Sequence, residues 1–199
     1  MVQPKAPSNP GRRKFLINAT SVVGAGAVAG AVVPFIGSWN PSAKAEAAGA
    51  PARADLSKLL PGEMMIVEWR GVPVYVVKHT QESMSVLNKN LSRLSDPDSL
   101  EDQQPDYARN ELRSRKKGIS VLTAVCTHLS CAPKFYPELG TTDFDSDWQG
   151  GFFCPCHGSK FDLVGRVYAG VPAPTNLPIP PHYFENENIL IIGEDGGAV

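Results

Sequence analysis

The cysteines and two of the four histidines lie in two short clusters, and these residues are the most able to do chemistry. Thiolates and imidazoles are ligands for zinc and for iron–sulfur clusters. Two cysteines and two histidines could therefore hold a tetrahedral zinc ion, or a two-iron cluster with both cysteines on one iron and both histidines on the other. A zinc site of that composition leaves two cysteines without a role. The clusters are Cys126-Thr127-His128-Leu129-Ser130-Cys131 and Cys154-Pro155-Cys156-His157-Gly158-Ser159.

Short apolar segments flank the clusters and predict strands that position them. Residues 119–125 are apolar and β-branched, which is typical of a buried strand, and they end directly before Cys126. Residues 132–153 separate the clusters and are expected to form a long loop that Trp148 and Phe152 pack down. The metal ligands are therefore expected in two loops at the end of a β structure.

The rest of the head, residues 55–199, is expected to be mostly β with one helical insertion. Residues 64–69 and 72–77 resemble a strand pair, and a hairpin is expected at 183–192. Residues 80–94 have apolar side chains at helical spacing, with Thr80 as the N-cap. The charged segment 95–118 is expected to be an exposed excursion.

Composition and charge exclude several classes of protein. With 18 Gly and 18 Pro among 199 residues, a helix bundle or coiled coil is disfavoured, and an apolar fraction of 42% excludes a wholly disordered chain. Four cysteines are too few for a disulfide scaffold. The net charge of −1 gives no reason to expect nucleic-acid binding. Residues after 50 carry 14 basic and 19 acidic side chains, so this part has a net charge of −5.

The N-terminus predicts export and a membrane anchor. Four basic residues precede residue 15, and residues 15–39 contain no charge. These 25 residues span about 37 Å as a helix, enough to cross a hydrocarbon core of about 30 Å. The positive flank predicts that residues 1–14 stay in the cytoplasm. Ala43-Lys44-Ala45 fits a signal peptidase site, but the length of the apolar run favours a retained anchor. The export signal resembles the twin-arginine (Tat) type in Gly11-Arg12-Arg13-Lys14-Phe15-Leu16-Ile17.

A linker is expected between the anchor and the head. Residues 40–54 contain no large apolar side chain, so they cannot bury a core and are predicted to form a flexible hinge. Their many alanines could form a transient helix. A tether of this kind suggests a head that moves.

The two cysteine–histidine clusters resemble the Rieske iron–sulfur motif, in the form found in quinol–cytochrome c reductases (the cytochrome bc1 complex). The matching residues are C-T-H-L-x-C and C-P-C-H-G-S, and the anchor, hinge, helical insertion and proline loop Gly170-Val171-Pro172-Ala173-Pro174 follow the family's layout. The resemblance implies one 2Fe–2S cluster, with Cys126 and Cys154 on one iron and His128 and His157 on the other. It also implies a disulfide between Cys131 and Cys156, which an oxidising periplasm permits.

Four further residues acquire roles from this resemblance. Ser159 matches a serine that donates a hydrogen bond to the cluster, and Leu129 matches a residue that covers the cluster and contacts the quinol pocket. Phe161 stands where the respiratory enzymes commonly have a tyrosine, so a hydrogen bond is lost and a lowered midpoint potential is expected. Ser130 replaces the usual glycine, a departure that we expect to be tolerated.

The resemblance implies the electron-transfer subunit of a proton-translocating quinol–cytochrome c reductase in a bacterial inner membrane, with the head in the periplasm. His157 meets the quinol, and the cluster accepts one electron and a coupled proton. Head movement then carries the electron to cytochrome c1. The implied partners are cytochrome b, cytochrome c1, the quinol and the lipid bilayer around residues 15–39, in a dimeric complex without nucleic acid.

Two other functions remain open at this stage: a Rieske subunit of another exported oxidoreductase such as arsenite oxidase, and a structural zinc protein. Outside the clusters, His79 and His182 are expected to be surface or structural residues. The acidic run Asp143, Asp145 and Asp147 lacks the Gly and distal Glu of an EF-hand loop, so a solvated turn is favoured over a calcium site.

Overall fold

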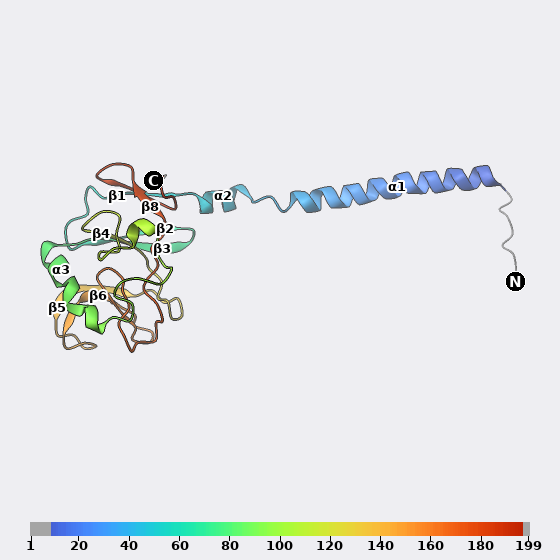
Figure 1. Ribbon diagram of the computed structural model, residues 1–199. Coiled ribbons are helices and arrows are strands. Elements are labelled where there is room, and N and C mark those ends of the chain that lie inside the picture. Colours follow the sequence, from blue (N-terminus) through green and yellow to red (C-terminus); the bar gives the residue numbers. More distant parts are fainter. Residues whose placement is uncertain (1–8, 197–199) are drawn as a thin grey trace, which may run out of the picture. The chain divides into compact units, whose positions relative to one another are not determined.

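The computed structural model describes residues 9–196, and the chain divides into two units after Ala47 (Figure 1). Lys5 of the expected basic stub lies outside the described residues. The two units are considered separately below.

Helix α1 (Pro10–Gly37) makes up most of the first unit. Asn9 caps its N-terminus by accepting a hydrogen bond from the Arg12 N–H at 3.1 Å, and Pro10 supplies a preset φ at the first helical position. The helix therefore begins five residues before the expected apolar span and includes the twin arginines. Its mean hydropathy reaches 1.8, and no side chain in it is buried. Among residues 9–196 it is the one helix long and apolar enough to cross a membrane, a test that N-terminal signal sequences also pass.

Part of the expected hinge, residues 40–54, has regular secondary structure and is not a flexible tether. Residues Ala43–Gly49 form helix α2, in keeping with their alanine content, and Ala52–Asp55 form strand β1. The strand arises because Ala54 is small enough to be buried in the head while Arg53 points outward and pairs with Glu185. The hinge expectation is therefore wrong for residues 52–54, which belong to the head.

The head contains three antiparallel sheets of three strands each within the described residues (Figure 1). Their orders are β1-β9-β8, β2-β3-β4 and β5-β6-β7. The strand bounds after β1 are β2 Met64–Trp69, β3 Val72–Lys78, β4 Ile119–Thr123, β5 Lys134–Gly140, β6 Trp148–Phe153, β7 Lys160–Asp162, β8 His182–Phe184 and β9 Ile189–Ile192. The expected strand pair, buried strand and C-terminal hairpin are all present.

The middle sheet, β2-β3-β4, is buried on both faces because successive side chains of a strand point to opposite sides. Val76 of β3 packs with Leu190 of β9 in one core. Its neighbours Tyr75 and Val77 pack in a second core that contains Phe152 of β6. The second core also includes Cys126 and Cys154, so both cysteines lie among buried apolar side chains.

The helical insertion is short and tight. Thr80 caps α3 (Gln81–Val86) by accepting a hydrogen bond from the Ser83 N–H, as expected, and the helix continues as the 3-10 helix η1 (Leu87–Arg93). A further 3-10 turn, η2, spans Asp106–Ala108.

Two sequence-based expectations for the longer connections are wrong. The segment 95–118 is not simply an exposed excursion, because Arg113 is 1% exposed and donates to the carbonyls of Val164 and Leu177 at 3.0 and 2.9 Å. Residues 132–153 are not a loop but mostly the β5–β6 hairpin. Trp148 and Phe152 are fully buried there, as expected.

Candidate metal centre

The two cysteine–histidine clusters form loops of the same construction. The first loop, residues 126–131, follows β4, and the second loop, residues 154–159, joins β6 to β7. In each, the N–H of the first cysteine donates to the carbonyl five residues later, at 2.8 Å. The carbonyl of the same cysteine accepts from the N–H four residues later, at 3.0 Å in the first loop and 2.9 Å in the second. That later residue has a positive φ in both cases: 63° at Ser130 and 78° at Gly158.

A disulfide joins the two loops. Cys131 and Cys156 are bonded, with their Cα atoms 6.7 Å apart. The pairing expected from the family resemblance is therefore present, and it leaves Cys126 and Cys154 as the two free cysteines. Both are buried, at 2% and 1% exposure. Burial raises the pKa of the Cys154 thiol, whereas hydrogen bonds from the backbone N–H groups of Cys156 and His157 oppose that shift.

The two histidines meet across the loops. The ring centroids of His128 and His157 lie 4.8 Å apart with the planes nearly perpendicular. His128 Nδ1 is buried and has no hydrogen-bond partner among residues 9–196. A buried imidazole nitrogen without a partner is costly. His182 Nε2 is also buried without a partner among the described residues, but only His128 shares a loop with a free cysteine and contacts a second histidine from the other loop. Two thiols and two imidazoles from facing loops thus fit the donor set of a His-ligated two-iron cluster.

The proline loop and Thr175, which directly follows it, form hydrogen bonds with the two cluster loops. The Ala173 N–H donates to Ser159 Oγ at 3.0 Å, and the Thr127 hydroxyl donates to the Thr175 carbonyl at 2.7 Å. Ser159 is fully buried, and because its oxygen accepts from Ala173, its own hydrogen remains available for donation elsewhere. The contact of Thr127 is one that sequence reasoning missed, since the hydroxyl's partner lies 48 residues away.

Leu129 and Phe161 occupy opposite environments. Leu129, between the ligands of the first loop, is 64% exposed at the surface. Phe161 is fully buried in the core that holds Cys126 and Cys154, with its backbone paired to Phe152. Leu129 is therefore accessible to a second molecule, whereas Phe161 is enclosed by the core of the head.

The remaining candidates lie elsewhere. His79 Nε2 lies 2.8 Å from Ser120 Oγ, and His182 Nδ1 lies 2.9 Å from the Pro180 carbonyl, so both are structural histidines. Burial lowers the pKa of His79 to about 4 and also lowers that of His182. Asp145 is not in a solvated turn: its carboxylate is 4% exposed and pairs with Arg93 and Lys160. Its charge is thus balanced by two cations of the protein itself.

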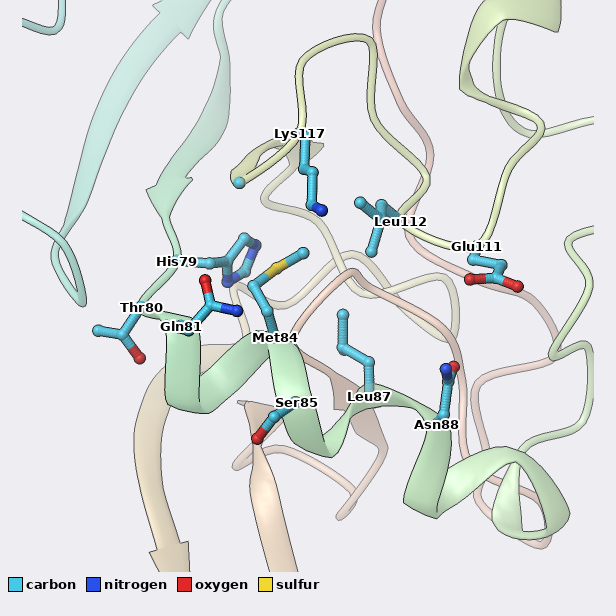
Figure 2. Close-up of a pocket in the computed structure, with 11 residues that line it drawn as sticks. His79, Thr80, Gln81, Met84, Ser85, Leu87, Asn88, Glu111, Leu112 and Lys117 are labelled. Atoms are coloured by element: carbon cyan, nitrogen blue, oxygen red, sulfur yellow. The ribbon is translucent and has the colours of Figure 1, made fainter.

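A cavity of about 460 Å³ lies beside α3, away from the cluster loops (Figure 2). Figure 2 shows Lys117 and Leu112 facing Met84 and Leu87 across it. The residues lining it include none from residues 126–131 or 154–159. The metal centre is thus formed by loops at the surface rather than by a ligand pocket.

Two family models match the chain. One is described as "Ubiquitinol-cytochrome C reductase Fe-S subunit TAT signal" and matches residues 3–42. The other is the Rieske [2Fe-2S] domain, which matches residues 101–181 and so spans both cluster loops.

Curated relatives extend over nearly the whole chain. The ubiquinol–cytochrome c reductase iron–sulfur subunit of Allochromatium vinosum is 53% identical over 96% of this chain and 92% of its own length. The subunit of the same name from Rhodospirillum rubrum is 43% identical over 94% of this chain and 96% of its own length. Among solved structures, a chain of a hyperthermophilic respiratory Complex III aligns with 89% of this chain and 98% of its own, at 25% identity and a TM-score of 0.49. On the strength of these relatives and both family models, the chain belongs to the iron–sulfur subunits of ubiquinol–cytochrome c reductase and carries a Rieske domain for one 2Fe–2S cluster.

Proposed function

We propose that Cys126 and Cys154 ligate one iron of the cluster and that His128 and His157 ligate the other. The observation that carries this assignment is the unpartnered, buried Nδ1 of His128 beside His157, in the same two loops as the two buried cysteines that the disulfide leaves free. When bound, the cluster supplies one-electron redox chemistry, and His-ligated clusters have potentials of about −150 to +300 mV, against about −400 mV for plant-type ferredoxins.

The same residues suit transfer of one electron with one proton from quinol. His157 is exposed, so the imidazole nitrogen that is not used for ligation can form a hydrogen bond with a quinol hydroxyl at the surface. Ser159 holds a buried hydroxyl whose hydrogen is available to an acceptor in the centre. Leu129 offers an exposed apolar contact beside the ligands, which we assign to the quinol pocket of cytochrome b.

The family supplies the setting for this chemistry. We infer that α1 anchors the chain in a bacterial inner membrane, with the N-terminus in the cytoplasm and the head in the periplasm, because the basic residues precede the apolar span. Cytochromes b and c1 are the expected partners in a dimeric complex, and movement of the head about residues 40–51, the part of the expected hinge that precedes β1, would connect them. The homology to this complex is the reason to prefer it over arsenite oxidase.

An EPR spectrum of the reduced full chain tests the ligand assignment. We expect the signal of a His-ligated two-iron cluster in the wild-type protein and its loss in His128→Ala. The matched control is His79→Gln, which changes a histidine outside the loops and should keep the signal. Stoichiometric zinc without an EPR signal would contradict the proposal.

The role of Leu129 calls for a separate measurement in the intact complex. Leu129→Ala should slow quinol oxidation and leave the EPR spectrum of the cluster in place, because the side chain is exposed and holds no ligand. Leu139→Ala, at another exposed leucine on β5, is the matched control and should leave the rate unchanged. Equal rates for the two variants would argue against contact between Leu129 and the quinol pocket.

A further inference from the structure

Four charged side chains form a compact cluster beside the second loop, and we call them the Asp145 clamp: Arg93, Asp145, Asp147 and Lys160. Asp145 Oδ2 lies 2.6 Å from an Arg93 Nη atom and 2.8 Å from Lys160 Nζ. Arg93 also lies 3.6 Å from the Asp147 carboxylate. Two cations thus face two carboxylates, and the clamp as a whole is neutral.

The clamp is attached to the base of the second loop through Lys160. Lys160 directly follows Ser159 and is paired in register with Phe153, which directly precedes Cys154. The Cys154 N–H donates to the Ser159 carbonyl at 2.8 Å. Lys160 and Phe153 are therefore the strand pair on which the loop with Cys154 and His157 is built.

The aromatic ring of Tyr168 packs against both cations of the Asp145 clamp. The Arg93 guanidinium lies 5.0 Å and Lys160 Nζ 5.4 Å from the ring centroid of Tyr168. The Tyr168 ring in turn stacks on fully buried Trp148 at 5.8 Å. The Asp145 side chain is only 4% exposed, so salt and water screen its charge weakly. Burial alone would raise the pKa of Asp145, but the hydrogen bonds from Arg93 and Lys160 lower it to about 2. The carboxylate is therefore charged at neutral pH.

We propose that Asp145 is a positioning residue for the redox centre: it holds Lys160 at the base of the second loop and cancels the charge that Lys160 would otherwise present to the centre. Reduction adds a negative charge to the centre, and an uncompensated cation nearby would favour the reduced state. Asp145 therefore keeps the potential lower than Lys160 alone would set it. This proposal rests on the ligand assignment above.

Redox titration of the full-length protein separates this charge effect from a purely structural one. Asp145→Asn keeps Oδ1, which accepts from the Asp147 N–H at 3.0 Å, but removes the charge, so the midpoint potential should rise. Lys160→Gln removes the cation and leaves Asp145, so the potential should fall. The double variant should return to the wild-type potential, and Lys160→Arg should stay there because it keeps the charge and the pairing.

A control variant removes an exposed ion pair outside the cluster loops. Glu187 lies 2.7 Å from Lys116 Nζ, with its side chain 90% exposed, so Glu187→Gln should leave the potential unchanged. Shifts of the same sign in Asp145→Asn and Lys160→Gln, or no shift in either with a normal EPR spectrum, would overturn the proposal. If Asp145→Asn fails to fold, the fall in midpoint potential expected for Lys160→Gln tests the proposal by itself. A wild-type chain without a two-iron signal would instead overturn the ligand assignment, and this proposal with it.

Discussion

Ser130 has a backbone conformation that its side chain does not favour. Its φ is 63°, which lies within 15° of the φ of 78° at Gly158, the corresponding residue of the second loop. A residue with a Cβ atom pays a steric penalty there that glycine avoids. The first loop tolerates the serine because the hydrogen bond from its N–H to the Cys126 carbonyl and the adjacent disulfide hold the turn.

Replacing Ser130 with glycine should therefore stabilise the protein. We expect the free energy of unfolding to rise by about 0.5–1 kcal/mol, since the relieved strain exceeds the extra entropy of the unfolded glycine. Denaturant unfolding of the two proteins measures this difference. Ser92→Gly, at an exposed serine in η1 without a positive φ, should destabilise instead, and a loss of stability in both variants would contradict the strain at Ser130.

Phe161 offers a second test at a single residue. Its ring is fully buried in the core that contains Cys126 and Cys154, so a para-hydroxyl would be placed near the centre without disturbing the surface. Phe161→Tyr should raise the midpoint potential by roughly 40 mV, because a hydrogen bond of about 1 kcal/mol would stabilise the reduced state. Phe135→Tyr, at a half-buried ring against the same core, is the control and should not shift the potential. An unchanged or lower potential in Phe161→Tyr would refute this account.

At the scale of elements, the sequence predicts structure that depends on neighbouring residues better than contacts between residues far apart in the chain. The strand pair at 64–78 and the Thr80 cap follow from neighbouring residues, and the site follows from ligands a few residues apart within each loop. The burial of Arg113 depends on carbonyls 51 and 64 residues away, so its charge suggested exposure. The burial of Asp145 has the same cause, because its cationic partners come from η1 and β7.

The junction of β3 and α3 should make the fold sensitive to acid. His79 lies there with Nε2 2.8 Å from Ser120 Oγ, and burial lowers its pKa from about 6.5 to about 4. Between these two values the unfolded state binds more protons at this histidine than the folded state, so stability falls as the pH falls through that window. His182, whose pKa is also lowered by burial, adds in the same direction.

Comparing wild type with His79→Gln isolates the contribution of this histidine. The wild-type free energy of unfolding should fall more steeply from pH 6.5 to pH 4 than that of the variant, by up to about 1.4 kcal/mol per pH unit. Unfolding curves at several pH values provide the slopes, and above pH 7 the difference between the two proteins should be constant. Parallel slopes between pH 6.5 and 4 would mean that His79 is not buried in its neutral form.

At the scale of the whole molecule, the hydrophobic cores lie entirely in the second unit. The buried apolar side chains of the described residues begin at Ala54, and α1 contributes none. The head, from Ala48 onward, should therefore fold without the anchor, since it carries its own cores and its own disulfide. Between α1 and β1, none of the side chains that the structure describes is buried.

Two truncated heads test where the folded unit begins. A fragment starting at Ala48 keeps β1, whose residues pair with β9 from Ala52↔Ile192 to Asp55↔Ile189. This fragment should have the same melting temperature and the same EPR spectrum as the head in the full-length protein. A fragment starting at Leu56 lacks this strand and its hydrogen bonds, each worth on the order of 1 kcal/mol, and leaves β9 as an unprotected edge. It should melt lower and aggregate more readily. If both fragments melted alike, β1 would be dispensable for the stability of the head. A lower melting temperature for the Leu56 fragment alone would show that the folded unit begins at or before Ala52.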